Sequence, residues 1–260
     1  MGLDYTLFGG KLTGSFEYYW NTTKDLLIAF PVSGSGYDYQ YRNLGETENK
    51  GIDLTINSTN ITNKNFTWNT SITLSHNKNS VKKLTGEDVQ LWEANFGYSQ
   101  NTHIIGVNQP LGQMYGYVTD GLYQVSDFDY DAATKTYTLK DGVPYAGEKG
   151  NVKPGMWKFK NIDGSKDNKI TEADKTVIGN AYPKIYGGIN NTFTYKDFDL
   201  SIFLTYSIGN DVFNATKLTN TKTALQNKNV LAVADSKHRW VLVNKAGDLI
   251  TDPQEMADIN

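Results

Sequence analysis

The chain has 260 residues, long enough for one large β domain or two ordinary ones, and its net charge of −3 argues against a nucleic-acid partner. It contains no cysteine, which excludes disulfides, thiolate metal sites and a cysteine nucleophile. Only 38% of the residues are hydrophobic, yet 13% are aromatic, a balance that suits β-structure with one wet face better than a sheet covered on both sides.

No stretch of the sequence approaches the roughly 18 consecutive apolar residues that a membrane helix needs. The N-terminal segment lacks the charged and apolar regions of a signal peptide, and it begins inside a strand pattern.

Side chains that alternate with a period of two predict strands in residues 1–77. The alternating runs are, in chain order, Leu3–Phe8, Lys11–Asn21 with a continuation to Phe30, Tyr37–Ser58 and Phe66–Asn77. They are joined by short turns at Gly9-Gly10 and Thr59–Asn65 and by a longer turn at Pro31–Gly36.

The alternation breaks down in residues 78–183, where we expect one small hairpin around Thr136–Tyr145. It returns in Ile185–Tyr195 and Phe198–Ile208, two runs joined by the dipeptide Lys196-Asp197. Each run has about eleven residues, which is the length that a tilted strand needs to cross a bilayer.

The chain thus divides into strands in 1–77 and 184–208, an excursion in 78–183 and a tail in 209–260, with one helix expected around Thr221–Val233. If successive strands run up and down one sheet, the short turns fall at one end and the long connections at the other. Outer-membrane barrels have this asymmetry, and aromatic residues near the strand ends favour it too. A soluble antiparallel sheet or sandwich would alternate in the same way.

On the membrane interpretation, six antiparallel strands form a segment of a transmembrane β-barrel, because six cannot close one of usual size. The two faces of Lys11–Asn21 then have different surroundings. Leu12, Phe16, Tyr18 and Trp20 are expected to face lipid, and Thr13, Ser15 and Glu17 are expected to face the lumen.

Residues 163–174 match the spacing of an EF-hand calcium loop. The expected Ca²⁺ ligands are Asp163, Ser165, Asp167, Thr171 and Asp174, together with the backbone carbonyl of Lys169. Ile170 falls where an apolar residue anchors such a loop, and Asn168 replaces the usual left-handed glycine. Three carboxylates predict a modest affinity. The alternative is a polar turn without metal. Because flanking helices are not evident, we expect a calcium site here to serve as a structural clip for an external loop rather than as a regulator.

Other residues offer less chemistry. The three histidines, His76, His103 and His238, have no carboxylate at ligand spacing, which argues against zinc. Three carboxylates lie close together in the sequence, Glu46, Glu48 and Asp53. They could form the carboxylate pair of a glycosidase, but charges on a solvated loop explain them better. No nucleophile-elbow, phosphate-loop or dinucleotide motif occurs, so we predict no enzyme. The aromatic residues Trp92, Phe96, Tyr98, Tyr115 and Tyr117 fit either a sugar-stacking surface or internal packing.

Several stretches together resemble the SusC/RagA-type TonB-dependent outer-membrane transporters. The stretches that carry the resemblance are Asn43–Leu54, Gly112–Gln124, Pro154-Gly155, Asp163–Asn180, Tyr182–Lys184, Asn190–Phe193 and Phe198–Phe203. They occur in a fixed order and cover most of residues 1–214. Within the calcium-like loop, Ser165 and Asn168 depart from the family's usual residues.

The resemblance implies a piece of a 22-stranded barrel in the outer membrane of a Gram-negative bacterium. It implies import of glycans or peptides, energised by TonB through an N-terminal plug region that this sequence lacks. It also implies a SusD-like surface lipoprotein as partner, with loops that contact it, and outer-membrane lipid around the wall. The alternative from another class is a soluble or surface-attached β-sheet module that binds carbohydrate with a calcium loop.

Overall fold

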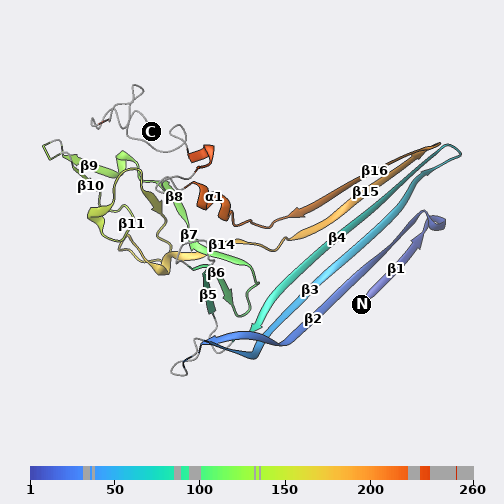
Figure 1. Ribbon diagram of the computed structural model, residues 1–260, viewed down its shortest axis with the longest axis horizontal. Coiled ribbons are helices and arrows are strands. Elements are labelled where there is room, and N and C mark those ends of the chain that lie inside the picture. Colours follow the sequence, from blue (N-terminus) through green and yellow to red (C-terminus); the bar gives the residue numbers. More distant parts are fainter. Residues whose placement is uncertain are drawn as a thin grey trace. The chain divides into compact units, whose positions relative to one another are not determined.

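The computed structural model describes residues 1–31, 36, 39–84, 89–93, 101–131, 133–134, 136–221, 229–234 and 250. Most of them lie in strands, and the long strands are antiparallel, which confirms the predicted all-β class (Figure 1). Among these residues, no helix is long and apolar enough to cross a membrane.

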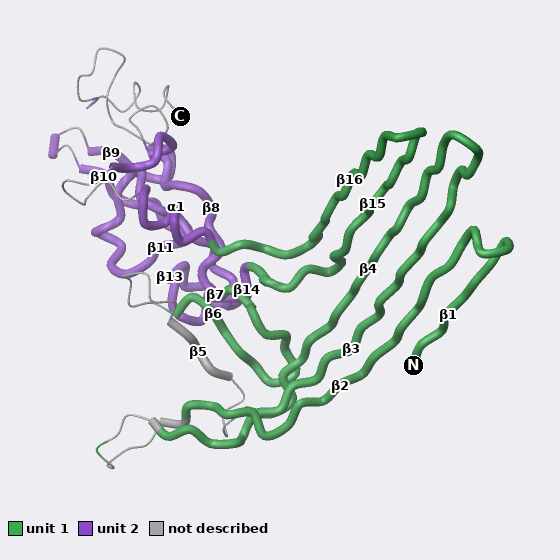
Figure 2. The backbone as a smooth tube through the Cα atoms, turned by 45° about the vertical axis from the view of Figure 1, so that its right-hand side comes forward, with its two compact units in different colours: residues 1–94, 99–114, 179–213 green, residues 95–98, 115–178, 214–260 purple. Residues whose placement is uncertain are grey.

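The chain separates into two compact units, which Figure 2 shows in different colours. The first comprises residues 1–94, 99–114 and 179–213, and the second comprises residues 95–98, 115–178 and 214–260.

A six-stranded antiparallel sheet forms most of the first unit, with its strands in the order β1-β2-β3-β4-β15-β16. These strands are β1 (Gly2–Leu7), β2 (Leu12–Pro31), β3 (Tyr39–Thr62), β4 (Phe66–Lys83), β15 (Ile185–Tyr195) and β16 (Phe198–Ile208). The last hairpin has the predicted bounds. By contrast, β4 continues beyond the predicted end at Asn77, and β3 continues into the predicted turn.

Three short turns lie together at one end of this sheet, as Figure 1 shows. The first is the 3₁₀ turn η1 (Phe8–Gly10), in which Gly9 and Gly10 have positive φ as their sequence predicts. The others follow Thr62 and Tyr195. The connections at the opposite end are long, so the predicted asymmetry of the sheet is confirmed.

A smaller set of strands completes the first unit. They are β5 (Val89–Glu93), β6 (Asn101–Gly106) and the beginning of β7 (Gln113–Tyr117). β5 pairs with β6, and β6 pairs with the first residues of β7, both antiparallel.

The second unit consists of short elements around a small core. Its strands are β8 (Thr119–Leu122), β9 (Phe128–Asp131), β10 (Thr136–Leu139), β11 (Tyr145–Ala146), β12 (Trp157–Phe159), β13 (Lys169–Ile170) and most of β14 (Lys175–Asn180). Its helical turns are η2 (Val125–Asp127), η3 (Lys149–Asn151), η4 (Glu172–Asp174), α1 (Ala215–Asn220) and η5 (Ala232–Ala234). The core is a buried cluster of Tyr123, Phe128, Leu139 and Val152.

Two local predictions in this unit need correction. The hairpin expected around Thr136–Tyr145 is wrong, because β10 pairs backwards with β9 and Tyr145 instead forms a parallel bridge to β13. The helix expected around Thr221–Val233 overlaps residues outside the described part. The described helix α1 ends at Asn220, before that segment.

Candidate functional site

One face of the six-stranded sheet is apolar, and its side chains form a continuous band. The band comprises Leu12, Phe16, Tyr18 and Trp20 of β2, Ile52, Leu54 and Ile56 of β3, Ile72 and Leu74 of β4, Ile189 and Phe193 of β15, and Leu200, Ile202 and Leu204 of β16. Leu200 and Leu204 are 55% and 58% exposed, whereas the core residue Leu139 is 3% exposed. The band therefore presents large apolar side chains outward.

The height of the band matches a hydrocarbon layer. Its rows run from Phe66 to His76 along β4, and His76 lies in the row of Ile52 and Tyr18. At about 3.4 Å per residue and a tilt of about 40°, this length projects to about 26 Å, close to the apolar band of outer-membrane barrels.

Aromatic side chains mark the end of the band next to the short turns. Phe193 stacks on Phe66, with ring centroids 6.5 Å apart, and on Trp68, with ring centroids 5.6 Å apart. Tyr195 and Phe198 lie opposite each other in the next row and are 52% and 77% exposed. Such a girdle is typical of a membrane interface.

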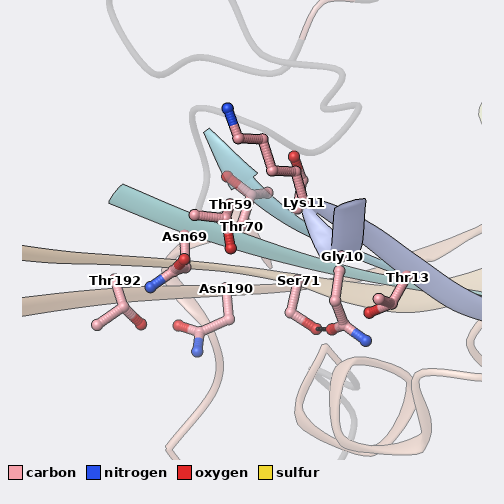
Figure 3. A pocket seen from close by; sticks show the side chains of 11 residues that line it. Gly10, Lys11, Thr13, Thr59, Asn69, Thr70, Ser71, Asn190 and Thr192 are labelled. Atoms are coloured by element: carbon pink, nitrogen blue, oxygen red, sulfur yellow. Dashed lines mark hydrogen bonds between the residues drawn. The ribbon is translucent and has the colours of Figure 1, made fainter. Parts of the chain in front are cut away.

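The opposite face of the sheet is mostly polar and carries a pocket of about 200 Å³ near the short turns (Figure 3). Its lining includes the side chains of Lys11, Thr13, Asn57, Thr59, Asn69, Ser71, Asn190 and Thr192. The Ser71 hydroxyl donates to Asn57 Oδ1 at 2.7 Å, and the Ser201 hydroxyl donates to Asn190 Oδ1 at 3.0 Å. Hydroxyl and carboxamide groups with one ammonium fit a neutral polar ligand such as a sugar or a peptide.

A chain of hydrogen bonds continues along this polar face towards the long connections. Tyr19 Oη donates to Asn77 Oδ1 at 3.1 Å. The Asn77 and Asn79 amides both donate to Asn49 Oδ1, at 3.2 and 2.9 Å. Asn79 Oδ1 in turn accepts the backbone N–H of Leu111 at 3.1 Å. Asn79 therefore connects the wall of the sheet to the segment between β6 and β7, which we call the inner loop (residues 106–112).

The inner loop is also bound to the edge of β4 beyond the last residue that β15 covers. Val81 N–H donates to the Gln109 carbonyl at 2.9 Å, and Asn108 N–H donates to the Val81 carbonyl at 2.7 Å. Asn108 and Gln109 thus both oppose Val81, as two residues oppose one in a β-bulge. In one class of bulge the first of the two residues is left-handed, and Asn108 fits this class with φ 63°. The Gln109 N–H to Gly106 carbonyl bond of 3.1 Å closes a turn with Asn108 at its third position.

In the second unit, the expected calcium ligands take part in local hydrogen bonds. Asp174 is fully buried, and its carboxylate accepts the backbone N–H groups of Ile162 at 2.7 Å, Asp163 at 3.2 Å and Thr171 at 2.8 Å. Asp163 and Asp167 close local turns instead, because Asp163 accepts Ser165 N–H at 2.7 Å and Asp167 accepts Lys169 N–H at 3.0 Å. Asn168 has φ 57°, so its predicted left-handed conformation is confirmed.

This arrangement holds the loop through backbone amides that donate to Asp174. Among the described residues, no group of three or more histidine or carboxylate side chains is placed to hold a metal ion. The Thr171 amide, followed by those of Ile162 and Asp163, lowers the pKa of Asp174 below its ordinary value and outweighs the opposing effect of burial. Calcium binding at this loop stays a prediction.

The other sequence candidates also stay apart. Asp53 accepts the Ser75 hydroxyl on the polar face, whereas Glu48 accepts Trp20 Nε1 at 2.7 Å on the apolar face. His76 and His103 lie on different strands, and His238 lies outside the described residues. Of the suggested sugar-stacking aromatics, Phe96, Tyr98 and the Trp92 side chain also lie outside them, and Tyr115 and Tyr117 lie in β7.

Sequence reasoning missed Asn79, Asn108 and Gln109, the residues that fasten the inner loop. The segment Gly106-Val-Asn-Gln109 does carry a signal, because asparagine tolerates the left-handed conformation that such a turn requires. Nothing in the alternation, however, shows that this turn pairs with β4.

Comparison with protein families gives a match over residues 1–147 to the family described as TonB dependent receptor-like, beta-barrel. TonB-dependent receptor P3 of Formosa agariphila is 38% identical over 221 residues, which is 84% of this chain and 21% of that protein. TonB-dependent receptor SusC of Bacteroides thetaiotaomicron is 28% identical over 217 residues, or 82% of this chain and 19% of that protein. The chain spans about a fifth of the length of these relatives.

The fold is also similar to a solved structure. The structure titled "Structure of the RagAB peptide transporter" superposes with a TM-score of 0.56 at 23% identity, covering 80% of this chain and 20% of that one. At this identity the similarity concerns the fold, and it matches the six-stranded antiparallel architecture described above.

Proposed function

Because the chain belongs to the TonB-dependent receptor β-barrel family, whose members lie in the outer membrane of Gram-negative bacteria, we propose that it forms wall and external loops of an importer for oligosaccharides or peptides. The apolar band faces lipid, and the polar face lines the lumen. Membership in this family removes the alternative of a soluble carbohydrate-binding module.

The observation that supports import of polar solutes is the pocket on the lumen face. Its hydroxyl and carboxamide groups around Asn57 and Asn190 can exchange hydrogen bonds with a solute, and Lys11 adds one positive charge. Sugars and peptides both offer matching donors and acceptors, so the pocket favours neither class.

Two partners belong to this proposal. A SusD-like surface lipoprotein would contact the external loops, and TonB would act through a plug region outside this chain. The short turns then lie in the periplasm, and the long connections of the sheet lie on the external side. The matched relatives are named receptors or transporters, which agrees with a role without catalysis.

The test is uptake by cells of the source bacterium with and without the gene, using labelled oligosaccharide and oligopeptide mixtures. We expect uptake of one class to require the gene. Asn190→Leu in the full-length protein should lower that uptake, whereas Ile202→Leu on the lipid face should not. If uptake of neither class depends on the gene, the proposal is wrong.

A further inference from the structure

We propose that a lysine cluster on the outer wall, formed by Lys50, Lys78 and Lys82, binds the phosphate groups of lipid headgroups in the external leaflet. This site concerns the lipid around the barrel and does not depend on what the barrel imports. It lies on the lipid-facing side of β3 and β4, just beyond the end of the apolar band that is remote from the short turns.

The strand register places two of these lysines at directly opposite positions on neighbouring strands. Trp20 lies opposite Lys50, and Lys50 lies opposite Lys78 on the next strand. Like charges on directly opposite residues are destabilising unless an anion lies beside them. Lys50 and Lys78 therefore form a position that a negative group stabilises.

Glu48, the carboxylate that forms ion pairs with this cluster, carries one negative charge against three positive ones. Glu48 pairs with Lys50 at 3.1 Å and with Lys82 at 3.3 Å, so a single negative charge is shared between two lysines. Lys78 adds a third positive charge on the same face. Three ammonium groups against one carboxylate leave an excess of positive charge that complements a phosphate.

Trp20 indicates at which level of the membrane the lysine cluster lies. Trp20 is 60% exposed, its Nε1 donates to Glu48 at 2.7 Å, and the Lys50 ammonium lies 3.9 Å from its ring centroid. An exposed tryptophan at the end of an apolar band sits at the level of the headgroups. The lysines just beyond it therefore lie where the lipid phosphates are, and their aliphatic stems can extend along the wall.

The experiment measures lipid binding by the full-length protein in detergent micelles. Diphosphoryl lipid A is titrated, and the thermal midpoint of unfolding is followed. We expect Lys50→Gln with Lys78→Gln to raise the half-saturating lipid concentration at least about tenfold, as for a loss of about 1.4 kcal/mol. The matched control is Lys64→Gln with Lys196→Gln at the short turns, which should leave it unchanged.

Two further arms make the outcome decisive. Dephosphorylated lipid A and inorganic phosphate, each alone, should leave the midpoint unchanged, and a full shift with either would overturn the assignment to lipid phosphate. Lys78→Gln alone keeps both ion pairs of Glu48 and guards against misfolding of the double variant. Equal half-saturation in Lys78→Gln and wild type would also overturn the proposal.

Discussion

Tyr206 reaches across a neighbouring strand to Thr73. Its hydroxyl donates to the Thr73 backbone carbonyl at 2.8 Å, although β15 lies between the two strands. The ring can cross because Gly187 is the residue opposite Tyr206 and has no side chain in its path. Tyr5 crosses Gly14 in the same way and donates to the Thr55 carbonyl at 3.2 Å.

This crossing predicts a stability effect at two positions. Tyr206→Phe should lower the free energy of unfolding by about 0.5–1.5 kcal/mol, the usual net value of one hydrogen bond. Gly187→Ala should cost more, because a Cβ there would overlap the Thr73 carbonyl oxygen. Urea unfolding of the full-length protein in micelles measures both. Tyr195→Phe, at the exposed turn end, is the control, and an effect there as large as in Tyr206→Phe would contradict the prediction.

The orientation of the wall predicts a contrast between neighbouring residues. Leu204 lies near the middle of the lipid-facing band, so Leu204→Arg should destabilise the barrel by about 2–4 kcal/mol. Thr205 faces the lumen, so Thr205→Arg should destabilise the barrel far less. The fraction of protein assembled in the outer membrane, assayed by resistance to heat and detergent, separates the two. Equal losses would mean that the faces are assigned wrongly.

The inner loop depends on one left-handed residue. Asn108→Val should destabilise the attachment of the loop by about 1–3 kcal/mol, because a β-branched residue is strained at positive φ. Asn108→Gly adopts the same backbone without strain and is the control. Proteolytic cleavage within residues 106–112 should accelerate in the valine variant alone. A glycine variant cleaved as fast would show that the turn conformation does not hold the loop.

Asp174 predicts an acid-sensitive segment in the second unit. Its pKa is lowered in the folded chain, so the stability that the carboxylate contributes is present above about pH 4 and is lost as the pH falls through the folded pKa. Hydrogen exchange at Ile162, Asp163 and Thr171, corrected for intrinsic rates, should therefore accelerate at low pH. In Asp174→Ala, which has no side-chain acceptor, exchange at these amides should be fast throughout. Protection that persists at low pH in wild type would refute the assignment.

Calcium binding at the same loop is testable independently. Asp174 already accepts three backbone N–H groups, so we expect a dissociation constant no tighter than about 10⁻⁴–10⁻³ M, the range of extracellular calcium modules. Isothermal titration should show heat with wild type and none with Asp163→Ala. Identical flat traces would dispose of the calcium prediction.

The sequence predicts the wall better than it predicts the loops, and the reason is physical. Side-chain alternation with a period of two is repeated over whole strands, so it predicts β15 and β16 with their correct bounds. It also predicts correctly that Leu12 and Thr13 lie on opposite faces of the sheet. The inner loop is attached by individual backbone hydrogen bonds at Val81, and such bonds produce no periodic pattern in the sequence.

The hairpin in the second unit was mispredicted for a related reason. The Asp141-Gly142 pair does form a turn, with Gly142 at φ 83°, but β10 pairs across an earlier turn, where Asp131 Oδ1 accepts Ala133 N–H at 2.9 Å. Pairing across that earlier turn brings Phe128 and Leu139 into the same buried cluster. A turn signal therefore locates a turn without telling which strands pair across it.

The tyrosine–glycine pairs bear on how the strands find their alignment during assembly. Hydrophobic alternation forbids a slip by one residue, but it is satisfied equally well after a slip by two. A two-residue slip of β16 would bring Tyr206 against Ile185 or Ile189, whose side chains block the path that Gly187 leaves open. Tyr19 opposite Gly51 and Tyr5 opposite Gly14 impose the same condition on three other strands. Each tyrosine ring fits only opposite its glycine. The pair therefore selects one strand register among those that differ by two residues and would expose the same apolar face to lipid.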